Sequence, residues 1–134
     1  MSAKPVRTLE NQQVSVQAVS ANFGEYANEQ DALSAIVARL AAALDPQAIW
    51  LFGSRATGNA RPDSDFDLLV LAKRNGAFGC DDYELVDAPL RGTGIGTDVV
   101  PCDLEVFEAS LGLKTSFVRQ IVDRGRLIYG EMPP

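Results

Sequence analysis

Two short stretches, FGSRATG at residues 52–58 and SDFDLLVLA at residues 64–72, decide the fold of this chain. The apolar run 48–52 predicts a short buried strand that ends at the Gly-Ser step. The run LLVL is too continuous for a half-exposed strand, so the predicted strand 66–72 should lie centrally in a sheet and be covered on both faces. Glycine, asparagine and proline between the two runs predict a loop, or a short helix followed by a turn.

Asp65 and Asp67 stand at the start of the second predicted strand. Residues two apart on a strand point to the same face, so these carboxylates should project side by side. Two carboxylates so close repel each other and are costly to desolvate. A divalent cation removes that penalty, and magnesium prefers a few carboxylates together with phosphate oxygens and water. The pair therefore predicts a magnesium site.

The Gly53-Ser54 step offers the complementary chemistry at the end of the first strand. Glycine permits close backbone approach, and successive amides at the start of a helix can receive phosphate oxygens. The Ser54 hydroxyl can add another donor. Arg55 has two interpretations, a phosphate contact or a pair with an acidic neighbour.

A third acid would complete the site, and Asp98 is the best candidate because it lies early in a third predicted strand, 97–102. If that strand lies beside the second, Asp98 can ligate the catalytic metal and accept the proton of an attacking hydroxyl. Two metal ions would then stabilise the attacking and leaving oxygens of an in-line displacement. Asp103 is the rival, although we favour a helix cap for it. Lower candidates are Asp87 and the pair 81–82.

GSRATG, SDFDL and the later TDVV at residues 97–100 together resemble the minimal nucleotidyltransferases (MNT-type, antitoxin-like) of the DNA polymerase beta-like superfamily. The resemblance implies that Gly53 and Ser54 bind the nucleotide. It implies metal binding by Asp65 and Asp67, with Asp98 as the third carboxylate. It also implies, for such minimal members, a separate helical HEPN-type partner protein on which a tyrosine is modified.

The rest of the chain supplies the scaffold. Residues 1–27 are polar and weakly patterned, which predicts a flexible arm before a nucleotidyltransferase domain at 28–134. Helices are predicted from a cap at Asn28 to residue 44, from a cap at Asp103 to about 109, and over 116–123, with a terminal strand at 126–129. The expected fold is α+β (α/β), a mixed, twisted sheet of about four strands with helices packed mainly on one face. The cleft should open at the sheet edge that bears the acids.

The amino-acid composition argues against several classes of function. The formal net charge is -6 at pH 7, which argues against nonspecific binding to duplex nucleic acid or to anionic membranes. The chain has no histidine, so histidine can serve neither as the general base nor as a metal ligand. Its two cysteines are expected to be reduced. No apolar run is long enough to span a bilayer, and we expect a cytoplasmic protein.

Three functions remain open at this point. The first is transfer of AMP from ATP to a hydroxyl of a partner protein, with magnesium and release of pyrophosphate. The second is transfer to a small molecule of the aminoglycoside type. The third is a nucleotide-binding or antitoxin module that acts by contact alone. A homodimer could supply a missing wall of the cleft.

Overall fold

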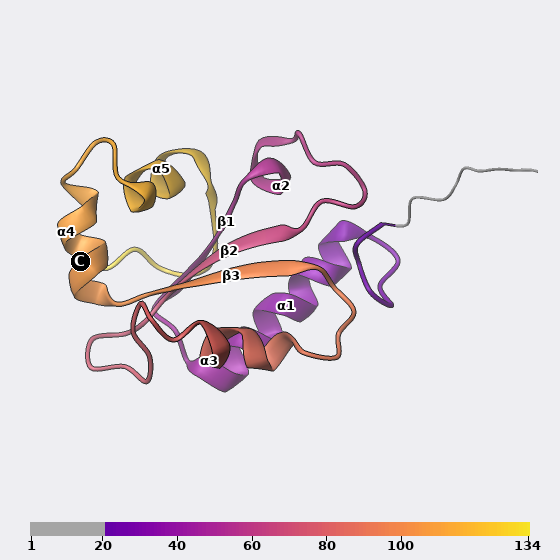
Figure 1. Cartoon of the computed structure of the whole chain (residues 1–134), viewed down its shortest axis with the longest axis horizontal. Coiled ribbons are helices and arrows are strands. Elements are labelled where there is room, and N and C mark those ends of the chain that lie inside the picture. Colours follow the sequence, from indigo (N-terminus) through magenta and orange to yellow (C-terminus); the bar gives the residue numbers. More distant parts are fainter. Residues whose placement is uncertain (1–20) are drawn as a thin grey trace, which may run out of the picture.

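Four strands form one mixed sheet in the order β3-β2-β1-β4 in the computed structural model, which describes residues 21–134 (Figure 1). β2 pairs antiparallel with β1 and parallel with β3, and β4 pairs antiparallel with β1. The predicted α+β class and the four-stranded mixed sheet are confirmed. The strands are β1 (Ala48–Phe52), β2 (Phe66–Leu71), β3 (Thr97–Cys102) and β4 (Arg126–Gly130).

β2 lies inside the sheet and is buried on both faces, as its unbroken apolar run predicted. Leu68 and Val70 point into one hydrophobic core, and Leu69 and Leu71 point into the other. Because the side chains of a strand alternate between faces, a strand apolar at every position needs cover on both sides.

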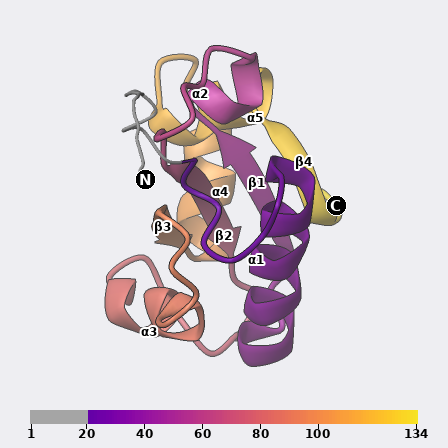
Figure 2. The same cartoon turned by 90° about the vertical axis from the view of Figure 1, so that its right-hand side faces the viewer.

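One face of the sheet is covered by the long helix α1 (Glu29–Leu44), together with α3 (Tyr83–Asp87) and the 3-10 turn η2 (Ala88–Leu90) (Figure 2). α1 begins at Asn28, whose side chain accepts a hydrogen bond from the amide of Asp31 at 2.8 Å. That cap satisfies one of the amides that have no partner inside the helix.

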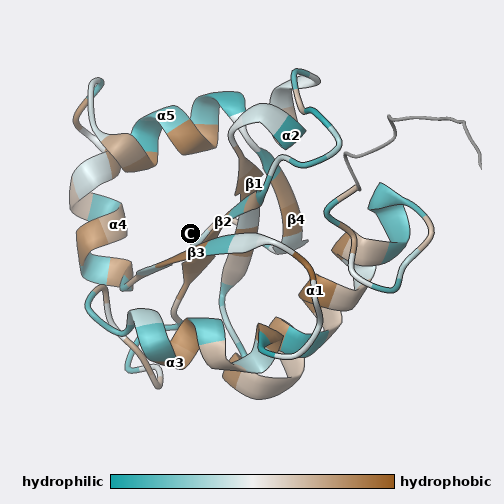
Figure 3. Cartoon of the chain, turned by 45° about the vertical axis from the view of Figure 1, so that its right-hand side comes forward, coloured by the Kyte–Doolittle hydropathy of each residue, from teal (hydrophilic) through white to brown (hydrophobic). Residues whose placement is uncertain are grey.

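Two shorter helices, α4 (Leu104–Leu111) and α5 (Phe117–Arg124), cover the opposite face. Trp50 of β1 is buried there and stacks on Phe107 at a centroid distance of 5.3 Å. Hydrophobic and hydrophilic residues alternate along α5 (Figure 3), which is the pattern of a helix with one face on a core. The expectation of helices mainly on one face was therefore wrong, because the second apolar face of β1 and β2 needs its own cover.

The segment just before α1 belongs to the folded domain. Phe23 forms a β-bridge with Ile95, and Tyr26 packs against the core beside α1. Of the arm predicted at residues 1–27, residues 1–20 lie outside the described residues. Both cysteines are free thiols. Within the described range, every helix is too short or too polar to cross a bilayer.

Candidate active site

Asp67 and Asp98 are neighbours across the parallel strands β2 and β3. The register pairs Asp67 directly with Asp98, and residues paired in register point to the same side of the sheet. Asp65 comes two positions before Asp67, at the entrance to β2. The register therefore places Asp67 and Asp98 side by side on the face that α4 and α5 cover deeper in the sheet, and Asp65 lies near Asp67 at the entrance to β2.

The charges of these acids act on one another. Partial burial raises the pKa of Asp67 above its usual range, and the carboxylates of Asp98 and Asp65 raise it further. Asp67 is half-buried, whereas Asp65 and Asp98 are exposed. The site thus concentrates negative charge around Asp67, and a bound cation would relieve the repulsion.

Gly53 lies against Asp67 at the end of β1. Phe52 pairs with Asp67 in the antiparallel register, and a Cβ atom built on Gly53 would stand 2.2 Å from Oδ2 of Asp67. Gly53 also has a φ of 73°, a conformation that favours glycine. It is the N-cap of the short helix α2 (Ser54–Thr57). The amides of Ala56 and Thr57 donate to the carbonyl of Gly53, whereas those of Ser54 and Arg55, at the very start of α2, have no partner inside the helix.

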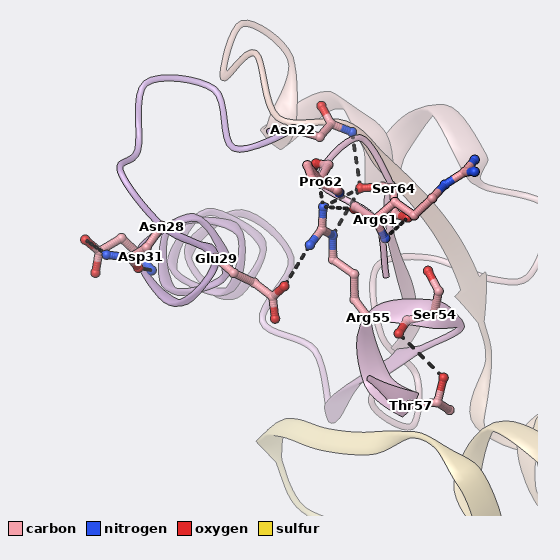
Figure 4. Close-up of polar contacts among 10 residues, drawn as sticks. All are labelled: Asn22, Asn28, Glu29, Asp31, Ser54, Arg55, Thr57, Arg61, Pro62 and Ser64. Atoms are coloured by element: carbon pink, nitrogen blue, oxygen red, sulfur yellow. Dashed lines mark hydrogen bonds and ion pairs between the residues drawn. The ribbon is translucent and has the colours of Figure 1, made fainter. Parts of the chain in front are cut away.

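Arg55 is buried, with 6% of its surface exposed, and the protein itself uses its donors (Figure 4). Nη1 donates to Glu29 at 2.7 Å, and Nε and Nη2 donate to the carbonyl of Ser64 at 3.0 and 2.8 Å. Nη2 also contacts the carbonyl of Pro62 at 3.0 Å. Of the two interpretations of Arg55, the pair with an acidic neighbour is the one present in the structure. Arg55 fixes the loop that leads into Asp65. Its expected contact with the nucleotide stays a prediction.

Comparison with known families identifies the chain. The family model described as Polymerase beta, Nucleotidyltransferase matches residues 34–133. The chain belongs to this polymerase beta nucleotidyltransferase family. It is accordingly a nucleotidyltransferase.

Two solved structures resemble this nucleotidyltransferase. One is a candidate nucleotidyltransferase from Sulfolobus solfataricus, with 24% identity and a TM-score of 0.50 over 74% of this chain and 78% of the other. The second is a toxin-antitoxin complex with AMP-PNP, with 26% identity and a TM-score of 0.50 over 74% of this chain and 73% of the other. Among curated proteins, no sequence matches significantly.

Three of the remaining acids that sequence reasoning considered for this nucleotidyltransferase have other partners. Asp103 caps α4 by accepting from the amide of Val106 at 2.8 Å, as favoured from the sequence. Asp82 accepts from the amide of Gly79 at 2.7 Å, and Asp87 pairs with Arg91. Asp98 is thus the candidate that the fold places beside Asp67.

The donor set suits magnesium, because it consists of carboxylate oxygens with neither histidine nor thiolate. In residues 21–134, however, no three acidic or cysteine side chains are placed to hold one ion together as they stand. One carboxylate oxygen of Asp65 accepts from Asn22 at 2.8 Å, and Asp67 lies against Gly53. A shared ion therefore requires Asp67 and Asp98 to turn toward the carboxylate of Asp65, whose Oδ1 stays bound to Asn22.

An open pocket of about 260 Å³ adjoins the site between the end of β1, α2 and α5. Gly53 and Thr57 form one wall, and Phe117, Gln120 and Arg124 of α5 form the other. A larger pocket of about 390 Å³ lies between α1 and β4, and none of the predicted site residues lines it.

Sequence reasoning missed Asn22, which contacts Asp65 directly. Residue 22 fell within the stretch expected to be a flexible arm, and no local pattern links it to residues 64–65 or 96. Long-range contacts bring it to the site, namely the bridge between Phe23 and Ile95 and the hydrogen bond from the amide of Asn22 to the carbonyl of Pro62.

Proposed function

We propose that this chain transfers AMP from ATP to an acceptor hydroxyl, with release of pyrophosphate, as the antitoxin member of a toxin-antitoxin pair. The observation that carries the proposal is the position of Asp67, which lies beside Asp98 in register, two residues after Asp65, and against Gly53. Metal ligands and phosphate donors thus border the same edge of the sheet, which is the arrangement that nucleotidyl transfer needs.

Each side chain has a role in this proposal. The amides that follow Gly53 and the hydroxyl of Ser54 receive phosphate oxygens of the triphosphate. Asp65, Asp67 and Asp98 hold magnesium, with two ions expected. When bound, magnesium neutralises charge on the phosphates and on the attacking and leaving oxygens.

The transfer balances as a single displacement. The acceptor oxygen forms a bond to the α-phosphorus, and the bond from that phosphorus to the bridging oxygen of the β-phosphate breaks. The electron pair of the broken bond leaves with pyrophosphate. The hydroxyl proton passes to Asp98, which is exposed and can deliver it to water. A carboxylate takes this role because the chain has no histidine.

The acceptor proposed is a hydroxyl, such as that of tyrosine, on a helical HEPN-type partner protein. Support comes from the toxin-antitoxin complex with AMP-PNP that this chain resembles at 26% identity. Exposure of Asp65 and Asp98 agrees with an acceptor that approaches from outside the domain.

The test follows label from α-labelled ATP, with magnesium, onto proteins of a host lysate. We expect one labelled band with the wild type and none with the Asp65→Asn, Asp67→Asn double variant. Asp63→Asn is the matched control, because Asp63 is an exposed acid of the same loop, and its one ion pair within residues 21–134 is a 4.0 Å contact with Arg61. A band that persists in the double variant would refute the assigned roles. If only small molecules are labelled, the acceptor is a small molecule and not a protein. If the protein binds ATP without transferring AMP, an antitoxin that acts by contact is favoured.

A further inference from the structure

Asn22 lies between the entrances of the two strands that carry the carboxylates. Its Nδ2 donates to Oδ1 of Asp65 at 2.8 Å, and its Oδ1 accepts from the amide of Gly96 at 2.9 Å. Its own amide donates to the carbonyl of Pro62 at 2.8 Å. Figure 4 shows its side chain directed at the loop beside Ser64, whose carbonyl is 3.5 Å from Nδ2. One residue thus joins the loop before β2 to the residue before β3.

The hydrogen-bond partners fix the orientation of the Asn22 amide. The amide of Gly96 can only donate, so the oxygen of Asn22 must face it. The nitrogen of Asn22 must then face Asp65, which as a carboxylate can only accept. The contact occupies Oδ1 of Asp65 and restricts rotation of the carboxylate.

Gly96 makes room for this contact. A Cβ atom at Gly96 would stand 1.8 Å from Nδ2 of Asn22 and 2.5 Å from Oδ1 of Asp65. A larger residue at position 96 would therefore displace both side chains. The lack of a side chain at Gly96 thus leaves the space that the hydrogen bond between Asn22 and Asp65 needs.

We propose that Asn22 is a positioning residue, which orients the carboxylate of Asp65 for metal binding through a hydrogen bond that Gly96 accommodates. Groups that hydrogen-bond a metal ligand orient it, and their loss commonly weakens metal affinity about 10- to 100-fold. The inference rests on the proposed function, because it takes Asp65 to be a metal ligand.

The test measures Mn²⁺ binding by electron paramagnetic resonance in the presence of α,β-methylene ATP, which cannot be cleaved at the transferred position. We expect Asn22→Ala to weaken Mn²⁺ binding about 10- to 100-fold. Asn59→Ala is the matched control, because Asn59 is an exposed asparagine of the neighbouring loop whose side chain contacts Thr57 and, in the part of the chain that the structure describes, no carboxylate. We expect this control to bind Mn²⁺ as the wild type does.

A double-mutant cycle separates positioning from general stabilisation. If Asn22 acts through Asp65, then Asn22→Ala should weaken Mn²⁺ binding no further in an Asp65→Asn background. Additive losses, or an unchanged affinity in the single variant, would overturn the inference. Failure of the wild type to bind Mn²⁺, or wild-type binding by Asp65→Asn, would instead overturn the proposed metal site.

A second variant covers the case in which Asn22→Ala does not fold. Asn22→Asp keeps an acceptor for the amide of Gly96 but replaces the donor to Asp65 with an oxygen. We expect a folded protein whose kcat for transfer is at least about tenfold lower. Wild-type kcat in this variant would show that the donor to Asp65 is dispensable and would overturn the proposal.

Discussion

Replacement of Arg55 by lysine tests how the loop before Asp65 is held. Arg55 is buried between the rings of Phe23 and Phe66, with its guanidinium carbon 5.1 and 4.6 Å from their centroids. Its planar group donates in several directions at once, to Glu29 on α1 and to carbonyls between residues 61 and 64. Lysine keeps the charge but presents its donors from a single atom.

The expected loss of stability follows from these contacts. Lysine cannot replace both the Nε contact with Ser64 and the contacts of the two terminal nitrogens, so at least one charge-assisted hydrogen bond is lost. Such bonds are worth about 1.5–3 kcal/mol each. A loss of about 2–4 kcal/mol would lower the Tm of a domain of this size by roughly 8–16 °C.

The assay combines thermal unfolding with transfer kinetics at a temperature where the variant is folded. Because the loop carries Asp65 into the site, we expect kcat to fall about 10- to 100-fold, with little change in KM for ATP. Glu29→Gln is the control: the Glu29 side chain is 41% exposed, so its loss of charge should cost no more than about 1 kcal/mol. An Arg55→Lys variant with unchanged Tm and a raised KM for ATP would refute this reasoning, and would return Arg55 to a direct nucleotide contact.

Three further predictions concern the carboxylates and their neighbours. Gly53→Ala and Gly58→Ala should each lose roughly 1–2 kcal/mol because both glycines have positive φ. Only Gly53→Ala should abolish transfer in the folded protein, since a Cβ at Gly58 would meet no other described residue within 4 Å beyond its chain neighbours. Equal activity of the two variants would contradict the packing of Gly53 against Asp67. The raised pKa of Asp67 means that the folded state binds this proton more tightly than the unfolded chain, so stability falls as pH rises through the folded-state pKa. Asp67→Asn should therefore raise the Tm of the metal-free protein at pH 7. The difference in Tm between the variant and the wild type should vanish below 3.8, the ordinary pKa of an aspartate carboxyl, and scanning calorimetry at several pH values can check this. Finally, Asp98→Asn should lower kcat by about 10²- to 10⁴-fold, whereas Asp103→Asn should leave it unchanged, because asparagine still caps α4. The opposite order of the two rates would make Asp103 the third carboxylate.

Local patterns were enough to predict most of the elements and the first carboxylate pair. The unbroken apolar run of β2 predicted a strand covered on both faces, and the caps at Asn28 and Asp103 marked the starts of two helices. These inferences succeed because strand alternation and helix capping act over a few residues. The spacing of Asp65 and Asp67 likewise predicts a common face for the two carboxylates.

Other features of the site depend on contacts between segments far apart in the chain. The register of β3 against β2 decides that Asp98, and not Asp103, lies beside Asp67. Arg55 is buried beside two aromatic rings, so its donors bind carbonyls of the loop before Asp65.

The sequence by itself thus determined the strands, the helix starts, and the paired carboxylates beside a Gly-Ser turn. Only the tertiary structure decided which acid joins the pair, how both faces of the sheet are covered, and that Asn22 contacts Asp65. The physical reason is that the first set depends on short-range backbone geometry. The second depends on strand register and on which buried donors and acceptors meet when the chain packs.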